Sequence, residues 1–158
     1  MRQLLITNEE FRSRARVVST NIDAAKIEAF IHEAEIMDLK PMLGDLFVDV
    51  VNNKERFQVF VEGGVLILGD NRRVEIEGLK TALAYFAFAR MARNGDAVLT
   101  RYGFVNKENS NSYRAEMEQR EQVYNDCMAI GKKCVNECMK YMRRDKKHDC
   151  KKFKIVGE

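Results

Sequence analysis

Soft metal ligands gather in the last third of the chain, and their spacing decides what chemistry they can do. Cys134 and Cys138 stand about one helical turn apart, and they could share a metal ion if His148 and Cys150 folded back onto them. However, the chain has no Cys-x-x-Cys pair, and Cys127, Cys134 and Cys138 recur at the spacing of an apolar helical stripe. We therefore predict that the cysteines are core residues with inert thiols, and that the protein holds no metal and no cofactor.

Catalytic groups lack their usual partners in this sequence. A cysteine nucleophile needs a base, and neither His32 nor His148 stands in a recognisable motif. His32 lies off the apolar stripe of its predicted helix, which indicates a solvated side chain. Asp45 and Asp49 form a carboxylate pair of the kind that charged helix faces often produce. Gly63-Gly64 is not followed by the Gly-Lys-Ser/Thr of a phosphate loop. We predict that the protein is not an enzyme.

Basic residues are concentrated at the C-terminal end. Residues 143–154 include seven Lys/Arg and two Asp, while the net charge of the whole chain is only +3. Six side chains are candidates for contact with DNA phosphates: Arg143, Arg144, Lys146, Lys147, Lys151 and Lys152. A solvated helix end explains the same residues equally well, because cations suit a helix C-terminus. A sequence-specific DNA reader is not predicted, since the rest of the chain is nearly neutral and lacks a helix-turn-helix pattern.

Hydropathy and the N-terminal residues bear on the compartment. No apolar run approaches the ~18 residues of a membrane span, so we expect no membrane partner. The apolar stretch within residues 1–7 is too short, and polar residues follow it too early, for a secretory signal. The four cysteines are not spread as the disulfide framework of a small secreted fold would be. We expect the chain to fold in a reducing cytoplasm.

Two helices are predicted in the first quarter of the chain. Thr7 and Glu10 have the spacing of a capping box, which predicts a short helix directly after Thr7. Residues 17–21 are predicted to connect it to a second helix over residues 22–37. Glu35 is expected to lie off the apolar stripe of that second helix. The stripe follows the helical period: Ile27, Phe30, Ile31 and Ala34.

Pro41 is expected to interrupt the helical backbone, because a proline ring clashes with the preceding turn of a helix. It is well placed in the first turn of a new, short helix that ends at Asn52-Asn53. The apolar face of that helix is formed by Met42, Leu43, Leu46, Phe47 and Val50. A further helical turn is predicted around Phe57 and Phe60.

The middle of the chain predicts a β-hairpin followed by a buried helix. Residues 65–68 and 74–76 are rich in β-branched and aliphatic side chains, and the turn signal Gly69-Asp70-Asn71 separates them. Residues 79–91 are apolar almost all round, which predicts a central helix. Asn94-Gly95 is a plausible stop for it.

The last part predicts a polar loop and then the longest helix. The loop spans residues 97–111, and Ser112 is a good N-cap for a helix over residues 113–142. One apolar stripe follows this helix: Val123, Cys127, Ile130, Cys134, Cys138 and Tyr141. We therefore predict a mostly α protein, a small helical bundle with one long C-terminal helix and a minor β-hairpin. Residues 1–142 would form the domain and residues 143–158 a basic tail.

The order of these segments resembles the head–tail connector (head-completion, adaptor) proteins of tailed phages and prophages, particularly a Bacteroides-type branch. The likeness covers about residues 3–142 and rests on helix patterns without catalytic residues. The segments that carry it are residues 5–11, 33–39, 41–47, 78–90, 100–107 and 112–142.

The resemblance implies a protomer that assembles into a homo-oligomeric ring under the portal, extends the DNA channel and offers a docking surface for tail proteins. It implies a virion component that is assembled in the bacterial host cytoplasm. The hairpin at residues 65–76 and the loop at residues 100–111 fit the role of neighbour-binding surfaces, with self-packing as the open alternative for each. The candidate contact residues are Leu66, Leu68, Asp70, Asn71, Tyr102, Phe104 and Lys107. The alternative function is a nucleic-acid-associated accessory protein that acts through its basic tail.

Overall fold

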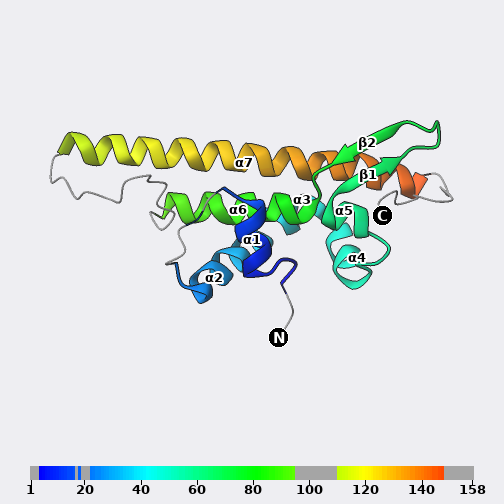
Figure 1. Cartoon of the computed structure of the whole chain (residues 1–158), viewed down its shortest axis with the longest axis horizontal. Helices are drawn as coiled ribbons and strands as arrows, with labels where there is room; N and C mark the ends of the chain where they lie inside the picture. Colours follow the sequence, from blue (N-terminus) through cyan, green and yellow to red (C-terminus); the bar gives the residue numbers. More distant parts are fainter. Residues whose placement is uncertain (1–3, 17, 19–21, 95–109, 148–158) are drawn as a thin grey trace.

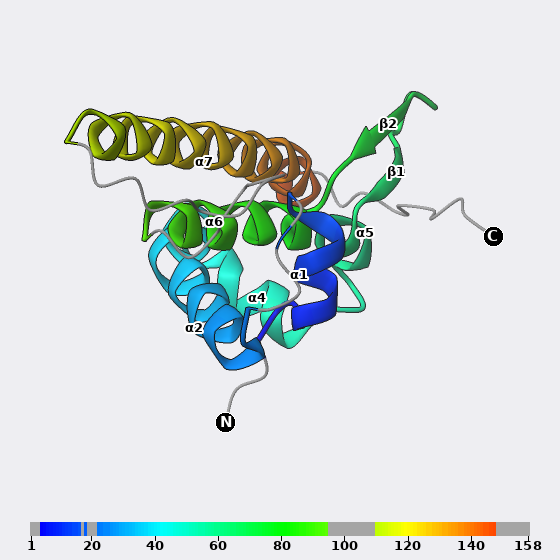
Figure 2. The ribbon, with the colours of Figure 1, turned by 60° about the vertical axis from the view of Figure 1, so that its left-hand side comes forward.

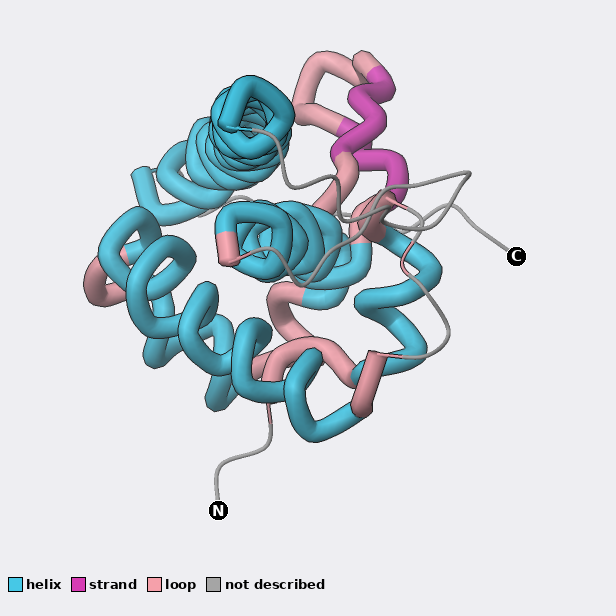
Figure 3. Tube along the Cα trace, turned by 90° about the vertical axis from the view of Figure 1, so that its left-hand side faces the viewer, coloured by secondary structure: helices cyan, strands magenta, loops and turns pink. Residues whose placement is uncertain are grey.

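Three layers of helices organise the molecule, as Figure 1 shows. The computed structural model describes residues 4–16, 18, 22–94 and 110–147, with the side chains of 110–116 and 144–147 left out. Helix α6 (Leu79–Arg93) lies in the middle, helix α7 (Ser110–Lys147) covers one side of it, and short helices cover the other. The view along α7 in Figure 3 shows the same order of layers.

The first two helices begin at side-chain caps, of which the sequence predicted the one at Thr7. In α1 (Asn8–Arg14), the Thr7 hydroxyl accepts from the Glu10 N–H, and the Glu10 carboxylate accepts from the Thr7 N–H, so the capping box is complete. Helix α2 (Ala24–Ala34) begins at Asp23, whose carboxylate accepts from the Ala25 N–H. Of the predicted connection over residues 17–21, only residue 18 lies among the described residues.

The helical backbone does not break before Pro41, and the predicted interruption is wrong. Helix α2 continues into a π-helical turn, η1 (Glu35–Leu39), and then into α3 (Lys40–Leu43). The Lys40 N–H donates to the Glu35 carbonyl, five residues back, and this wider turn gives the proline ring room that an α-helical turn lacks. The chain leaves the helix only at Gly44, where φ is 56°.

The π turn also changes which side chains face the core. Glu35 was expected on the outer side, yet it is fully buried, and so is Leu39 one wider turn later. Ile36 and Met37 are turned outward instead, with 42% and 60% of their surface exposed. The apolar stripe was predicted with 3.6 residues per turn. A π turn holds more residues than that, so the side chains that follow it face other directions than predicted.

Two short helices complete the layer, and the hairpin follows them and rises beside α7 (Figures 1 and 3). Helix α4 (Leu46–Asn52) and helix α5 (Gln58–Glu62) bury the predicted apolar side chains, including Phe47 and Phe60. Strands β1 (Gly64–Ile67) and β2 (Arg73–Ile76) pair antiparallel, with Leu66 opposite Val74 and Gly64 opposite Ile76. The predicted hairpin is therefore present, between α5 and α6.

The contact between α6 and α7 forms the centre of the core. Phe86 and Phe88 of α6 are fully buried, as the predicted central helix requires, and α6 ends at Asn94. Gly131 of α7 faces the Phe86 ring so closely that a Cβ at residue 131 would overlap it. The predicted stripe of α7 faces α6, with Cys127, Cys134, Cys138 and Tyr141 buried and Val123 and Ile130 packed against the core.

Helix α7 is longer at both ends than the sequence predicted. It begins at Ser110, so Ser112 lies inside it, and it continues to Lys147, past the expected domain boundary at residue 142. The fold class is confirmed: a mostly α protein with one long C-terminal helix and a minor hairpin.

Candidate interaction surfaces

The hairpin tip is a three-residue turn closed by backbone hydrogen bonds. The Leu68 N–H donates to the Arg72 carbonyl at 2.9 Å, and the Asn71 N–H donates to the Leu68 carbonyl at 2.9 Å. Asn71 takes a left-handed conformation with φ 62°, which asparagine tolerates better than most residues. Hydrogen bonds from the side chain and backbone of Arg72 lower the pKa of Asp70. The tip therefore presents a fixed pair of opposite charges to solvent.

The two faces of the hairpin differ in solvent exposure, so some of the predicted contact residues are buried and others are exposed. Leu66 is only 1% exposed and belongs to the chain's own core, which favours self-packing, and its role in binding a neighbour stays a prediction. Leu68 is half-buried and packs against the same core. Asp70 and Asn71 at the tip are exposed. The part of the hairpin that is open to a partner is thus its tip and outer face.

Two glycines close the base of the hairpin. Gly63 and Gly78 have φ of 87° and 85°, a region that disfavours any residue with a Cβ. A Cβ at Gly78 would overlap the backbone of Gly63, and a Cβ at Gly63 would overlap the backbone of Glu77. The chain therefore leaves the helical body and returns to it at nearly the same point.

The other predicted contact residues fall into two groups. Tyr102, Phe104 and Lys107 of the loop, and Lys151 and Lys152 of the tail, lie outside the described residues, as does most of the loop. The remaining tail candidates lie within α7, where Arg143 is exposed: Arg143, Arg144, Lys146 and Lys147.

The thiols of α7 are poorly suited to nucleophilic chemistry. Burial raises the pKa of Cys127, Cys134 and Cys138, in the last case to about 12. The Cys138 thiol lies 3.7 Å from the Phe60 carbonyl, to which it donates a weak hydrogen bond. These thiols are therefore protonated at neutral pH. His148 and Cys150 lie outside the described residues, and within that described part no three His, Cys, Asp or Glu side chains group as metal ligands would.

Buried Glu35 is the polar residue that sequence reasoning missed. Its Oε2 accepts a hydrogen bond of 3.0 Å from the Leu5 N–H, so this carboxylate holds the N-terminal segment against the π turn. The signal that could have found it is the spacing of four residues through Ile27, Ile31, Glu35 and Leu39, all of them buried. This contact is structural and lies away from the surface.

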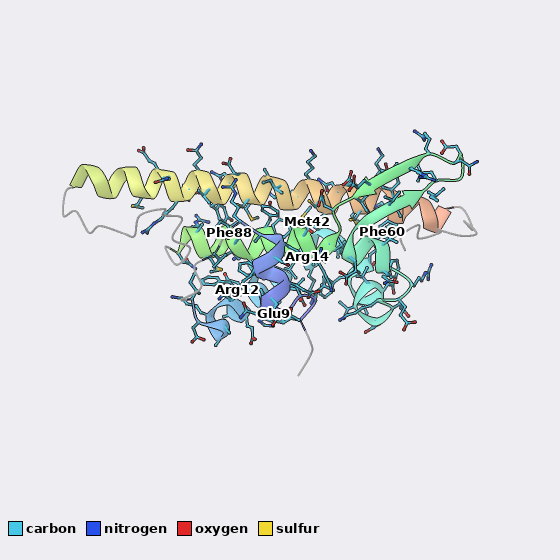
Figure 4. All side chains as sticks on the ribbon, in the orientation of Figure 1. Glu9, Arg12, Arg14, Met42, Phe60 and Phe88 are labelled. Carbon is cyan, nitrogen blue, oxygen red and sulfur yellow. The ribbon has the colours of Figure 1, made fainter. Side chains whose placement is uncertain are left out.

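Ion pairs tie the short helices to α6. Arg90 of α6 donates to both carboxylate oxygens of Asp38, at 2.7 and 3.1 Å, and to Glu33 at 2.6 Å. Arg14 of α1 (Figure 4) donates to the Thr81 hydroxyl of α6 at 3.2 Å and to the Glu62 carboxylate of α5 at 2.9 Å. The bidentate pair of Arg90 with Asp38 fixes orientation as well as contact.

A groove of about 410 Å³ opens beside the second of these networks. Lys80 stands at its wall, where its ammonium group contacts both Glu10 and Glu62 at 2.5 Å. Burial opposes the charge of Lys80, but hydrogen bonds to the two carboxylates raise its pKa overall. The groove is lined by Leu4, Leu5, Thr7, Glu10, Lys54, Glu55, Gln58, Val61, Glu62 and Lys80. At the wall of this groove, the contacts of Lys80 with Glu10 and Glu62 link α6 to α1 and α5.

Fold and surface together define a small helical protein whose polar groups join its elements and whose long helix and hairpin project from the body. Residues 39–153 match a family described as a family of unknown function (DUF6712), and the chain belongs to that family. No curated protein matches the chain significantly. No solved structure does so either. No helix among the described residues has the length and apolar character needed to cross a membrane.

Proposed function

We propose that this chain is a structural, non-enzymatic assembly protein: a subunit of a phage or prophage head–tail connector that forms a ring between portal and tail proteins. The observation that carries the proposal is the placement of two projecting elements at opposite ends of one rigid body. The N-terminal end of α7 extends past the end of α6 (Figure 1), and the tip of the hairpin projects beyond the helical body (Figure 2).

The overhanging N-terminal end of α7 supports the proposal because it extends beyond the part of the helix that packs against the core. Met117 near this end is 53% exposed, although it is a large apolar side chain on a helix whose later turns are well buried. Among the described residues, no other element covers this end of the helix (Figure 1), so its exposed apolar side chain is available for contact with another subunit. The hairpin tip is the second projecting element, and it lies far from this end of α7 along the longest axis of the molecule (Figure 1).

The rigidity of the body supports the same proposal. Arg90 connects α6 to the π turn, and Lys80 connects α6 to both α1 and α5. A subunit that transmits force and position between two larger assemblies needs its projecting elements fixed to one another in this way. The raised pKa of the α7 thiols argues against the alternative of a cysteine enzyme.

Co-assembly tests the proposal directly. We expect portal, capsid and tail genes beside the gene for this chain, and a ring when the purified chain is mixed with that portal protein and viewed by negative-stain electron microscopy. A replacement of both tip residues, Asp70→Ala with Asn71→Gly, keeps a conformation that the turn permits. It should leave the protomer folded and weaken this co-assembly.

Absence of any complex between the unmodified chain and the cognate portal protein would contradict the proposal.

A further inference from the structure

The outer face of the C-terminal half of α7 carries an unusual charge distribution. Lys132, Lys133, Lys140 and Arg143 are all exposed, and their spacing along α7 places them on one face, opposite the buried Cys134, Val135 and Cys138. Residues 127–143 include one acidic residue, Glu137, which is half-buried at the flank of this face. We call the four cations the basic strip.

The basic strip lacks neutralising partners in the described part of the chain. None of the ion pairs among the described residues includes any of its four side chains. Lys140 lies 5.4 Å from the ring of Tyr141, which does not neutralise its charge. Burial raises the pKa of Cys134, and the charges of Glu77 and Glu137, which reach this half of α7, raise it further. Two acids beside four cations leave the face positive.

The strip is held straight by the core beneath it. Cys134, Val135 and Cys138, on the opposite face of the same turns, are buried against the rest of the protein. From residue 132 to residue 143 the helix rises about 16 Å, at ~1.5 Å per residue. A duplex carries one phosphate charge per ~1.7 Å of its axis, so a rigid strip of this length can lie against several phosphates at once.

The chemistry of the strip selects its ligand. We propose that the basic strip binds the phosphate backbone of double-stranded DNA, without reading sequence. Ala129 and Asn136 are the other exposed residues on this face, so it lacks the apolar or aromatic anchors that a protein interface needs at its centre. Tyr141 is buried, and no aromatic side chain is left on this face for the stacking that single-stranded binders use.

This inference goes beyond the proposed function and does not depend on it. A connector subunit could lack DNA contacts, and a DNA-contacting protein need not be a connector. It also differs from the expectation of a basic tail, because Lys132, Lys133 and Lys140 precede the predicted tail and lie on the folded domain.

Titration of the full chain against a short fluorescein-labelled duplex of random sequence, followed by anisotropy at several salt concentrations, tests the inference. The strip variant replaces Lys132, Lys133 and Lys140 with Glu. The control variant replaces three exposed lysines elsewhere, Lys26, Lys40 and Lys54, with Glu, so both variants have the same net charge. We expect at least about a tenfold loss of affinity at ~50 mM salt for the strip variant, and a salt slope less steep by about 2 to 3.

The control variant should bind within about threefold of the unmodified chain, because distant charges are screened beyond a Debye length of ~10 Å. Equal losses in both variants would mean that only net charge matters, and would overturn the inference. It would also be overturned if only Lys151→Gln with Lys152→Gln weakened binding, or if the unmodified chain did not bind the duplex. A strip variant that bound DNA normally but lost self-association would assign the strip to a second copy of this chain and equally refute DNA contact.

Discussion

Lys80 shows how much of the architecture depends on single charged residues. Its ammonium group contacts Glu10 of α1 and Glu62 of α5 from its own position on α6, so one side chain joins three helices. Only 13% of the Lys80 side chain is exposed, which limits the competition from water for these contacts. The arrangement should make stability sensitive to the protonation of its acidic members.

The first prediction concerns this pH dependence. Burial alone would raise the pKa of Glu10, but hydrogen bonds from Lys80 and the Thr7 N–H lower it overall, below its usual value of 4.5. A lowered pKa means that Glu10 stabilises the fold above pH 4.5, and that this contribution is lost as the pH falls through the folded-state pKa. Urea unfolding from pH 7 to pH 3 should show a smaller acid-induced loss of stability in Glu10→Gln than in the unmodified chain. Parallel curves for the two proteins would show that Glu10 makes no such contribution.

The second prediction concerns Gly131, where α7 approaches α6 most tightly. Alanine normally favours a helix over glycine by about 1 kcal/mol, yet a Cβ at residue 131 would overlap the fully buried Phe86 ring. We expect Gly131→Ala to lower the free energy of unfolding by about 1 to 3 kcal/mol, because overpacking outweighs helix propensity. Gly69→Ala is the control, since its Cβ would meet nothing within 4 Å.

A double-mutant cycle isolates the clash at Gly131. Phe86→Leu alone should destabilise by leaving space behind it, and Gly131→Ala should cost less in the Phe86→Leu background than in the unmodified chain. Additive effects of the two substitutions would show that the methyl group at residue 131 and the Phe86 ring do not compete for the same space.

At the scale of elements, amphipathic periodicity predicted most of the fold. The capping box of α1, the central position of α6 and the stripe of α7 follow from local patterns, because each pattern reports directly which face is apolar. The π turn was missed because a sequence periodicity of 3.6 cannot show where one turn will be wider. Burial of Glu35 was missed for a different reason: its partner, the Leu5 N–H, comes from a segment 30 residues away, so local sequence does not show that the carboxylate is paired.

The third prediction compares the two faces of the hairpin. Leu66 on the inner face is 1% exposed, whereas its neighbour Ile67 on the outer face is only half-buried. Leu66→Ala should lower the free energy of unfolding by about 2 to 4 kcal/mol, in line with other buried leucines. Ile67→Ala should cost distinctly less. Equal costs in a chemical denaturation experiment would mean that the hairpin does not pack on the body through one face.

At the scale of the whole molecule, the sequence could predict elements but only part of the candidate surface. Leu66 reads as an exposed strand residue when the hairpin is considered alone, and only the packing of the hairpin on the body removes it from the surface. The basic strip shows the opposite case. Lys132, Lys133 and Lys140 attract no attention in a nearly neutral body, and only the packing of α7 against α6 shows that the face they share is exposed.

The fourth prediction tests whether the overhanging end of α7 binds a neighbour. Met117 is 53% exposed on this end, and Val48 of α4 is 57% exposed at another place on the surface. Met117→Ser and Val48→Ser should each change the free energy of unfolding by less than about 0.5 kcal/mol. Met117→Ser should raise the concentration needed for ring assembly, as followed by mass photometry with portal protein, while Val48→Ser should not. An equal effect of the two substitutions would remove the overhang from the proposed interface.

The paired glycines at the base of the hairpin have a consequence for engineering and for divergence between relatives. Because the backbones of Gly63 and Gly78 lie in contact, the segment between them is a loop whose two ends are held together at its base. Chain insertions are tolerated best where the ends of a segment already meet, since lengthening such a segment adds little loop-closure entropy. The turn after Leu68 is therefore a natural place to graft an epitope tag or a fluorophore-binding peptide. Changes in hairpin length there would alter how far the protein reaches without disturbing the helices that support it.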